Sequence, residues 1–157
     1  MTRSREEAMR ESWGWMLFAH AKVLWALEAD LLEQHDLPIT WFDVMNRLRE
    51  APGGRLRMHE LERASLSTRS GLTRLIDRIE AAGYVRRERS AEDRRGVYVV
   101  ITQAGNDKID RVWPDHEASI AQHFGQYLDL DDAVAIEVAS RKILADDVVP
   151  TAVPRIP

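Results

Sequence analysis

The segment from Ser65 to Gly105 constrains the fold of this 157-residue chain more than any other part of the sequence. Apolar residues recur in it at the i, i+3, i+4 and i+7 spacing of one buried helical face: Leu72, Leu75, Ile76 and Ile79. Gly83 follows, and glycine ends helices readily because it adopts the left-handed conformation without steric penalty. Residues 84–89 and 97–101 are then typical of two strands. The segment therefore predicts a short amphipathic helix followed by a hairpin.

Basic residues are concentrated in the same segment. Residues 63–95 hold nine Lys or Arg against five Asp or Glu, a net charge of +4, whereas the rest of the chain holds thirteen against twenty-one, or −8. Phosphate attracts the basic segment and repels the acidic body, so this distribution favours a nucleic-acid partner. A partner membrane surface would instead require basic residues along an amphipathic helix.

The chain before this segment predicts three helices and a short strand. A proline-free run over residues 6–34 carries apolar residues on two faces; this indicates contact with another chain, although a helix buried in a large core has the same pattern. Thr40 and Asp43 have the spacing of a capping box at the start of a second helix. After a Pro-Gly-Gly turn, Leu56 is expected in a short strand that joins the hairpin, and residues 58–64 in a third helix.

The chain after this segment predicts two more helices. Thr102 is placed to cap a long helix over residues 103–127, in which Pro114 removes one backbone donor and should bend or restart the helix. Asp129 or Asp131 is expected to cap a last helix that reaches Asp146.

Several classes of protein are excluded by what the sequence lacks. Without cysteine there is neither a disulfide framework nor a thiolate metal site. No run of eighteen apolar residues could span a membrane, and the charged N-terminus does not resemble a signal peptide, so we expect a cytoplasmic protein. No G-x-S-x-G, H-E-x-x-H or phosphate-binding glycine loop indicates an enzyme. His116 and His123 lie seven apart, which is a weak metal signal; a solvated helix face is the favoured alternative. We therefore predict no catalytic activity, no metal and no cofactor.

Residues 73–105 resemble the signature of the MarR family of transcriptional regulators, in register. The family pattern is TRL-DRLE-x-x-GLV-R, then D-x-R, then a strand that ends in LT-x-x-G. The matching stretches here are Thr73 to Glu80, Gly83 to Arg87, Asp93 with Arg95, and Ile101 to Gly105. Gly71 departs from the pattern, because a better helix former is usual inside this helix; the cost is about 1 kcal/mol relative to Ala.

The resemblance implies a mainly α fold with a small β-hairpin wing, built as one domain over residues 1–157. Residues 40–102 would form a winged helix-turn-helix DNA-binding lobe, residues 5–35 and 103–147 a helical dimerisation region, and residues 148–157 a flexible tail. The implied function is a homodimeric regulator of double-stranded DNA, a repressor that a small-molecule ligand releases from a palindromic operator. Two recognition helices must then lie about one turn of DNA apart. The alternative is a winged-helix module that binds protein and has no specific DNA binding.

Candidate DNA-binding residues begin at the start of the recognition helix. Hydroxyls, backbone N–H groups and the helix dipole there can hold phosphate: Ser67, Thr68, Arg69 and Ser70. Thr73, Arg74 and Arg78 follow on the exposed face, where an arginine can bind guanine in a bidentate way. The alternative for each arginine is a solvated side chain or an intrahelical ion pair with Asp77.

Further candidates lie on the wing. The resemblance implies that Arg95 enters the minor groove, where narrow A·T-rich stretches attract a guanidinium. Asp93 would orient Arg95 or hold the loop, and the adjacent Arg94 is expected to contact phosphate. Three arginines of the first wing strand are expected to contact phosphate or simply to keep the surface polar: Arg86, Arg87 and Arg89.

A ligand pocket is expected between the dimer body and the DNA-binding lobe, again from the resemblance. Its candidate lining residues combine apolar walls with a few polar groups: Trp13, His20, Trp41, Met45 and Trp113. A small aromatic or phenolic anion would suit such a site. For each residue taken alone, an ordinary hydrophobic core is the favoured interpretation.

Overall fold

The computed structural model describes residues 3–64, 69–89 and 96–144. They form a mainly helical fold with one three-stranded antiparallel sheet, as predicted. The elements are α1 (Arg5–His35), α2 (Ile39–Glu50), the 3-10 turn η1 (Pro52–Gly54), β1 (Arg55–Arg57), α3 (Met58–Ala64), α4 (Arg69–Ala81), β2 (Val85–Arg89), β3 (Val97–Ile101), α5 (Gln103–His123), the 3-10 turn η2 (Gly125–Tyr127) and α6 (Leu130–Ile143).

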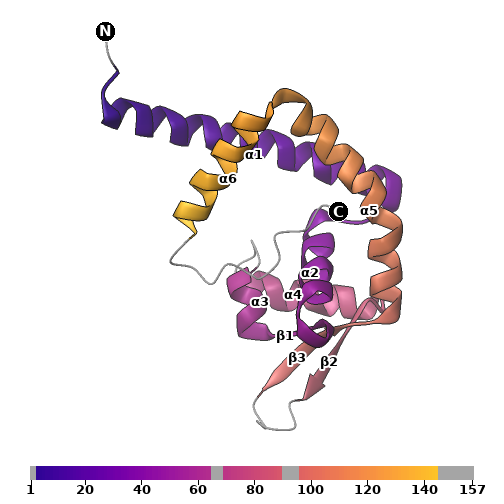
Figure 1. Cartoon of the computed structure of the whole chain (residues 1–157). Helices are drawn as coiled ribbons and strands as arrows, with labels where there is room; N and C mark the ends of the chain where they lie inside the picture. The colour runs from indigo at the N-terminus through magenta and orange to yellow at the C-terminus, as the bar shows by residue number, and fades with distance from the viewer. Residues whose placement is uncertain (1–2, 65–68, 90–95, 145–157) are drawn as a thin grey trace.

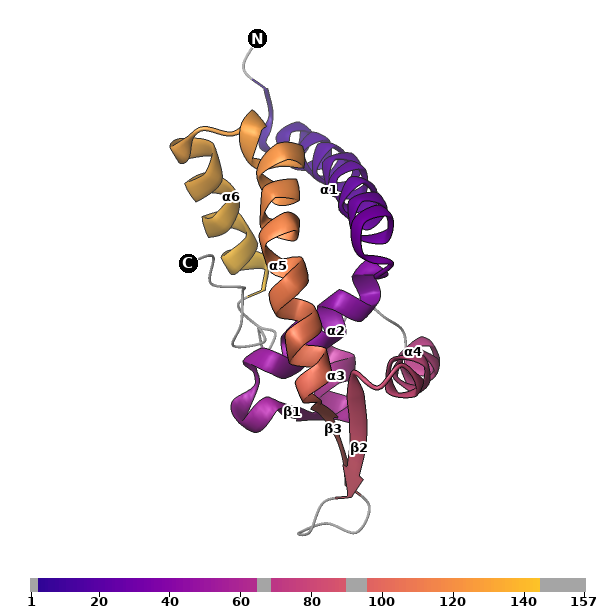
Figure 2. The same ribbon diagram turned by 90° about the vertical axis from the view of Figure 1, so that its right-hand side faces the viewer.

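The elements separate into an upper and a lower part (Figures 1 and 2). α1, α6 and the end of α5 occupy the upper part, whereas α2, α3, α4 and the sheet occupy the lower part. α5 belongs to both, because it begins beside the sheet and ends near α6. The strands extend downward from the lower part as a narrow projection.

The hydrophobic core lies in the lower part, between the helices and one face of the sheet. The predicted apolar stripe of α4 is confirmed, since all four of its residues are buried. Opposite them lie fully buried residues of α2, α3, the sheet and α5: Val44, Met45, Leu48, Leu61, Val99, Ile109 and Val112. Burial of one such aliphatic side chain stabilises a fold by about 1.5–3 kcal/mol.

The sheet has the strand order β1-β3-β2, so β3 is the central strand. The prediction that Leu56 joins the hairpin is confirmed: Leu56 pairs with Val99, and Arg57 pairs with Tyr98. On the other side Arg87 pairs with Val99. Because side chains alternate along a strand, residues paired with Val99 share its core-facing side.

Two predicted helix ends are confirmed, and both are set by local chemistry. Gly83 follows α4 with φ +83°, in the left-handed region. Thr102 caps α5, since its hydroxyl accepts the Gly105 N–H at 3.1 Å and donates to the Gly83 carbonyl at 2.7 Å. The Thr102 N–H also donates to the Tyr84 carbonyl at 3.0 Å. These bonds join the base of the hairpin to the start of α5.

The predicted capping box at the start of α2 is wrong. α2 begins at Ile39, and its first N–H donates to the Glu28 carboxylate of α1 at 2.6 Å. Asp43 instead pairs with Arg47 one turn later, at 2.8 Å. A tertiary contact has therefore replaced the local cap that Thr40 could have supplied.

The last two helices are shorter than predicted. α5 continues without a break past Pro114, which is exposed, so water can bond the carbonyl that loses its donor. It ends at His123 rather than near residue 127, where the 3-10 turn takes over. Asp129 caps α6 as predicted, accepting the Asp132 N–H at 2.9 Å, and α6 ends at Ile143. The predicted tail over residues 148–157 lies outside the described residues.

Candidate nucleic-acid interface

The face of α4 opposite the core stripe is exposed and basic. Thr73, Arg74, Asp77 and Arg78 all lie on this face. Arg74 and Arg78 form no ion pair with any described residue, so the intrahelical alternative is not realised for either. Their two guanidinium groups therefore remain open to an anionic partner.

Asp77 is paired from a different element, by Arg87 of β2. An Arg87 guanidinium nitrogen lies 2.7 Å from the Asp77 carboxylate, and another bonds the Glu80 carboxylate. The Arg87 backbone N–H also donates to Glu80, at 2.8 Å. The Arg87 side chain is only 28% exposed and bonds two carboxylates of α4, so it ties the hairpin to that helix. A phosphate contact of Arg87 stays a prediction. From the sequence we expected a surface arginine and did not predict these ion pairs. The alternation of side chains along the strand could have indicated them, because it places Arg87 on the core-facing side of β2.

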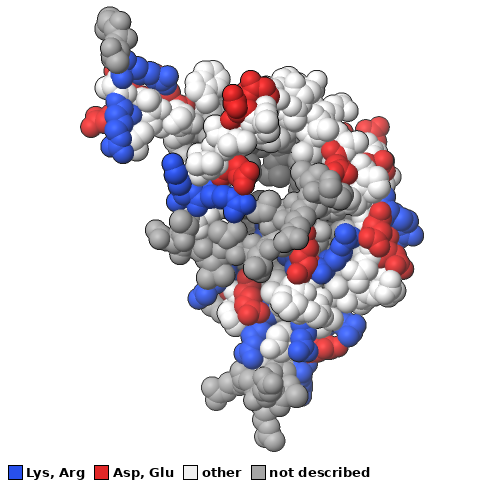
Figure 3. All heavy atoms as spheres, in the orientation of Figure 1, with Lys and Arg blue, Asp and Glu red and all other residues white. Residues whose placement is uncertain are grey.

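The remaining arginines of the first wing strand differ from Arg87. Arg86 lies on the opposite side of the sheet and pairs with Glu88 at 2.9 Å. Arg89 is exposed at the end of β2. β1 adds Arg55 and Arg57. Lys and Arg side chains gather over the strands at the lower end of the molecule (Figure 3).

Several predicted contact residues lie outside what the structure describes. These are Ser67, Thr68, Asp93, Arg94 and Arg95. Arg69 and Ser70 begin α4, but only their backbone is described. Their roles, including entry of Arg95 into the minor groove, stay predictions.

The short helix before α4 completes a helix-turn-helix pair. The fully buried Leu61 fastens α3 to the core. Glu60 accepts the Arg57 N–H at 2.7 Å, which joins the end of β1 to the start of α3. The sheet, α3 and α4 are thus held together around one apolar centre.

Comparison with known proteins agrees with this arrangement. The sequence profile of the MarR family matches residues 35–96. The crystal structure of AbsC, a MarR family regulator from Streptomyces coelicolor, superimposes with a TM-score of 0.80 at 31% identity over 92% of this chain and 97% of that one. This chain belongs to the MarR family of transcriptional regulators.

Two further proteins similar to this chain are a solved MarR family structure and a sequence relative. Sco3205 from Streptomyces coelicolor, solved in complex with DNA, has a TM-score of 0.79 at 26% identity, covering 91% of this chain and 88% of its own. The transcriptional regulator PrsX from Escherichia coli is 34% identical over 107 residues, or 67% of this chain. That match spans 64% of PrsX, so this chain covers less than two thirds of that relative's length.

The two histidines of α5 are not on a solvated helix face, contrary to the alternative we offered for them. His116 is buried against Phe42 of α2, with ring centroids 4.3 Å apart, and burial lowers the pKa of its imidazole. His123 is half-buried and bonds Asp30 of α1 at 3.0 Å. Ser119 bonds the same carboxylate and, more than His123, lowers the pKa of Asp30. No group of three metal-ligating side chains occurs among the described residues.

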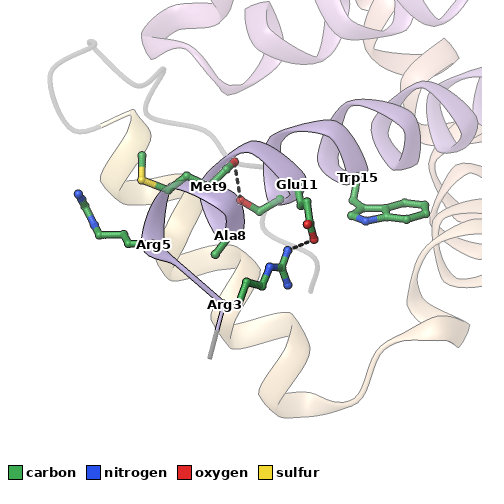
Figure 4. A pocket seen from close by; sticks show the side chains of 7 residues that line it. Arg3, Arg5, Ala8, Met9, Glu11 and Trp15 are labelled. Carbon is green, nitrogen blue, oxygen red and sulfur yellow. Dashed lines mark hydrogen bonds and ion pairs between the residues drawn. The ribbon is translucent and has the colours of Figure 1, made fainter. Parts of the chain in front are cut away.

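The five candidate pocket residues occupy different environments. Trp13 and His20 are exposed on α1, whereas Met45 is fully buried in the core. Trp41 packs edge-on against Tyr84, and Trp113 stacks on Phe42, with centroids 6.5 and 6.0 Å apart. For Trp41, Met45 and Trp113 this packing favours the core interpretation, and a shared ligand crevice stays a prediction. One shallow hollow lies elsewhere, on the first turns of α1 (Figure 4), lined by residues that include Arg3, Met9 and Trp15.

A large apolar surface is uncovered in the upper part of the molecule. On α1, four large side chains are 60–75% exposed: Trp13, Trp15, Phe18 and Trp25. Every described residue of α6 is exposed, including Leu130 at 78%. None of the described helices has the length and apolar character to cross a bilayer.

Proposed function

We propose that this protein is a transcriptional regulator that reads a palindromic operator in double-stranded DNA, and that it acts as a repressor. The observation that carries the proposal is the exposed face of α4, where Arg74 and Arg78 have no described ion-pair partner. This face lies in a fold shared with Sco3205, which was solved in complex with DNA. Two relatives are repressors: YetL from Bacillus subtilis, at 28% identity, and MprA from Escherichia coli, at 25%.

The chemistry of α4 suits the major groove. A helix fits that groove, and an arginine can donate two parallel hydrogen bonds to O6 and N7 of guanine. Thr73 adds a hydroxyl and a methyl group on the same face. Arg87 neutralises Asp77, the one acidic residue of this face, and so removes a source of repulsion from phosphate. By resemblance to the family, Asp93, Arg94 and Arg95 would add the minor-groove contact.

A second copy of the chain is the proposed cover for the apolar surface of α1 and α6. Exposed patches of this kind mark interfaces, because a single chain gains nothing from leaving large aromatic side chains in water. Residues 5–35 and 103–147 would then form the dimerisation region. A twofold dimer would present two copies of α4 to two half-sites, which is why the proposed operator is palindromic.

Release by a small aromatic or phenolic ligand completes the proposal. Its support is the resemblance to the family. We propose that the protein acts in the cytoplasm, where the operator is accessible.

The test measures binding to the DNA that lies upstream of the gene for this protein. Arg74→Ala and Arg78→Ala are each expected to weaken binding about 5- to 150-fold, the equivalent of 1–3 kcal/mol for a bidentate base contact. Arg111→Ala is the matched control, since Arg111 is an exposed arginine of α5 and belongs to neither α4 nor the wing. A salt titration separates the proposal from a protein-binding module, because phosphate contacts impose a steep salt dependence. Folded variants that bind as tightly as the wild type would overturn the assignment of α4.

A further inference from the structure

One side of the sheet faces away from the helices, and we name it the outer sheet face. Because Leu56 and Val99 point into the core, their neighbours along each strand point outward. The register gives two cross-strand rows on this face: Arg55–Val100–Arg86 and Arg57–Tyr98–Glu88. It therefore carries three arginines and one glutamate around a single aromatic ring.

Tyr98 holds two of these arginines in place. The guanidinium carbons of Arg55 and Arg57 lie 4.7 and 5.2 Å from the centre of the Tyr98 ring. The Arg57 Nε–H also donates to the Tyr98 hydroxyl at 3.2 Å. A guanidinium that rests on an aromatic face loses less freedom when it binds a ligand, because part of its motion is already restricted. The ring thus preorganises a pair of planar cations.

The positive charge of this face is only partly neutralised. Glu88 is committed to Arg86 by a bond of 2.9 Å. Arg55 is exposed, and no carboxylate of the described residues pairs with it. Val100 is buried between Arg55 and Arg86 in the register, and burial of an aliphatic neighbour does not require a charged head group at the surface.

We propose that the outer sheet face binds the sugar–phosphate backbone of duplex DNA next to the wing, outside the segment that α4 reads. This inference rests on the proposed function. The face is formed partly by β2 and β3, so DNA that lies against the end of β2 at Arg89 and the start of β3 at Val97 passes close to it. Planar guanidinium groups match phosphate oxygens in geometry as well as in charge. Base stacking is disfavoured, because arginines already occupy Tyr98.

The test compares Arg55→Met with Arg55→Lys by fluorescence anisotropy on a long duplex that contains the operator. Methionine keeps an apolar stem and removes the charge, whereas lysine keeps the charge. The loss of one phosphate contact lowers the slope of log K against log salt by about 0.9 per chain. The fall in affinity between 50 and 200 mM salt should then be about 3.5-fold smaller for each bound Arg55→Met chain. Arg55→Lys should keep the wild-type slope.

Two controls separate the possible outcomes. Arg111→Met removes an exposed charge from α5 and should leave the salt slope unchanged. If Arg111→Met and Arg55→Met lower the slope equally, the effect comes from net charge and the inference is wrong. A duplex trimmed to the operator alone should abolish the difference between Arg55→Met and wild type. If the wild type binds steeply and Arg55→Met has the same slope on the long duplex, the outer sheet face does not contact DNA. If the wild type itself binds no duplex, the proposed function fails instead.

Discussion

Replacing Arg87 with methionine should weaken the junction between the hairpin and the recognition helix, because Arg87 joins β2 to α4 by two ion pairs. The change keeps an unbranched stem against the core and removes the guanidinium that bonds Asp77 and Glu80. Exposed ion pairs contribute about 0.2–1 kcal/mol each, and these two are partly shielded from water. We therefore expect a loss of about 1–2 kcal/mol in the free energy of unfolding, which for a chain of this size lowers Tm by about 2–8 °C.

The effect on DNA binding has a separate cause. Without Arg87, two carboxylates beside the recognition face lose their countercharge and repel phosphate. At physiological salt this repulsion should total about 1 kcal/mol, or about fivefold in Kd. Adding Asp77→Asn and Glu80→Gln to Arg87→Met removes the two charges and should restore much of the affinity without restoring the stability.

Urea unfolding and fluorescence anisotropy measure the two effects, at one protein concentration because unfolding of an oligomer depends on it. Arg86→Met is the matched control for stability: it is the neighbouring arginine on the same strand, lies on the opposite side of the sheet and, among the described residues, pairs with Glu88. Its DNA affinity is not a control, because Arg86 lies on the outer sheet face. The free energy of unfolding of the control should fall by less than about 0.5 kcal/mol. If Arg87→Met and Arg86→Met lower the free energy of unfolding equally, the ion pairs of Arg87 with α4 do not stabilise the fold.

Four further predictions test the packing of the chain and of the proposed dimer. Gly105→Ala should destabilise the fold by about 3 kcal/mol, because a Cβ there would lie 2.3 Å from the Tyr84 carbonyl oxygen. Gly14→Ala, where nothing lies within 4 Å, should instead gain about 1 kcal/mol in thermal unfolding. Burial lowers the pKa of His116 below its ordinary 6.5, so the unfolded chain binds the proton more readily. Stability should then fall as the pH drops through 6.5, more in the wild type than in His116→Phe; equal urea midpoint shifts between pH 7.5 and 5.5 would contradict this. Phe18→Asp should weaken the proposed dimer more than about 100-fold in analytical ultracentrifugation, since each copy loses about 2–3 kcal/mol of apolar burial.

The parts of the fold that depend on local rules could be predicted from the sequence. The apolar stripe of α4, its end at Gly83 and the cap of α5 at Thr102 each follow from residues within one or two turns. The exposure of Arg74 and Arg78 follows as well, because a buried stripe on one side of a helix leaves the other side in water.

Features that depend on contacts between distant segments could not be predicted from the sequence. Nothing near α2 indicates that Glu28 reaches it from α1 in place of Thr40. Spacing showed that His116 and His123 share one face of a helix, but not that Phe42 packs against His116 or that Asp30 bonds His123. The role of Arg87 required knowledge of which side of β2 meets α4. Composition likewise could not distinguish a ligand pocket from a core, since both use the same aromatic residues.

The bonds of Thr102 have a mechanical consequence. Because they join the base of the wing to the first turn of α5, the hairpin and the helix should move together as one rigid unit. α5 has 21 residues, so it is about 31 Å long at the usual rise of an α-helix. A tilt of α5 by about 5° around its wing end moves the opposite end by about 3 Å. The same tilt around the opposite end moves the base of the hairpin by about the same distance. A shift of that size is comparable to the length of a hydrogen bond, so a modest change of angle where α5 meets α1 is enough to move the wing out of register with a DNA groove.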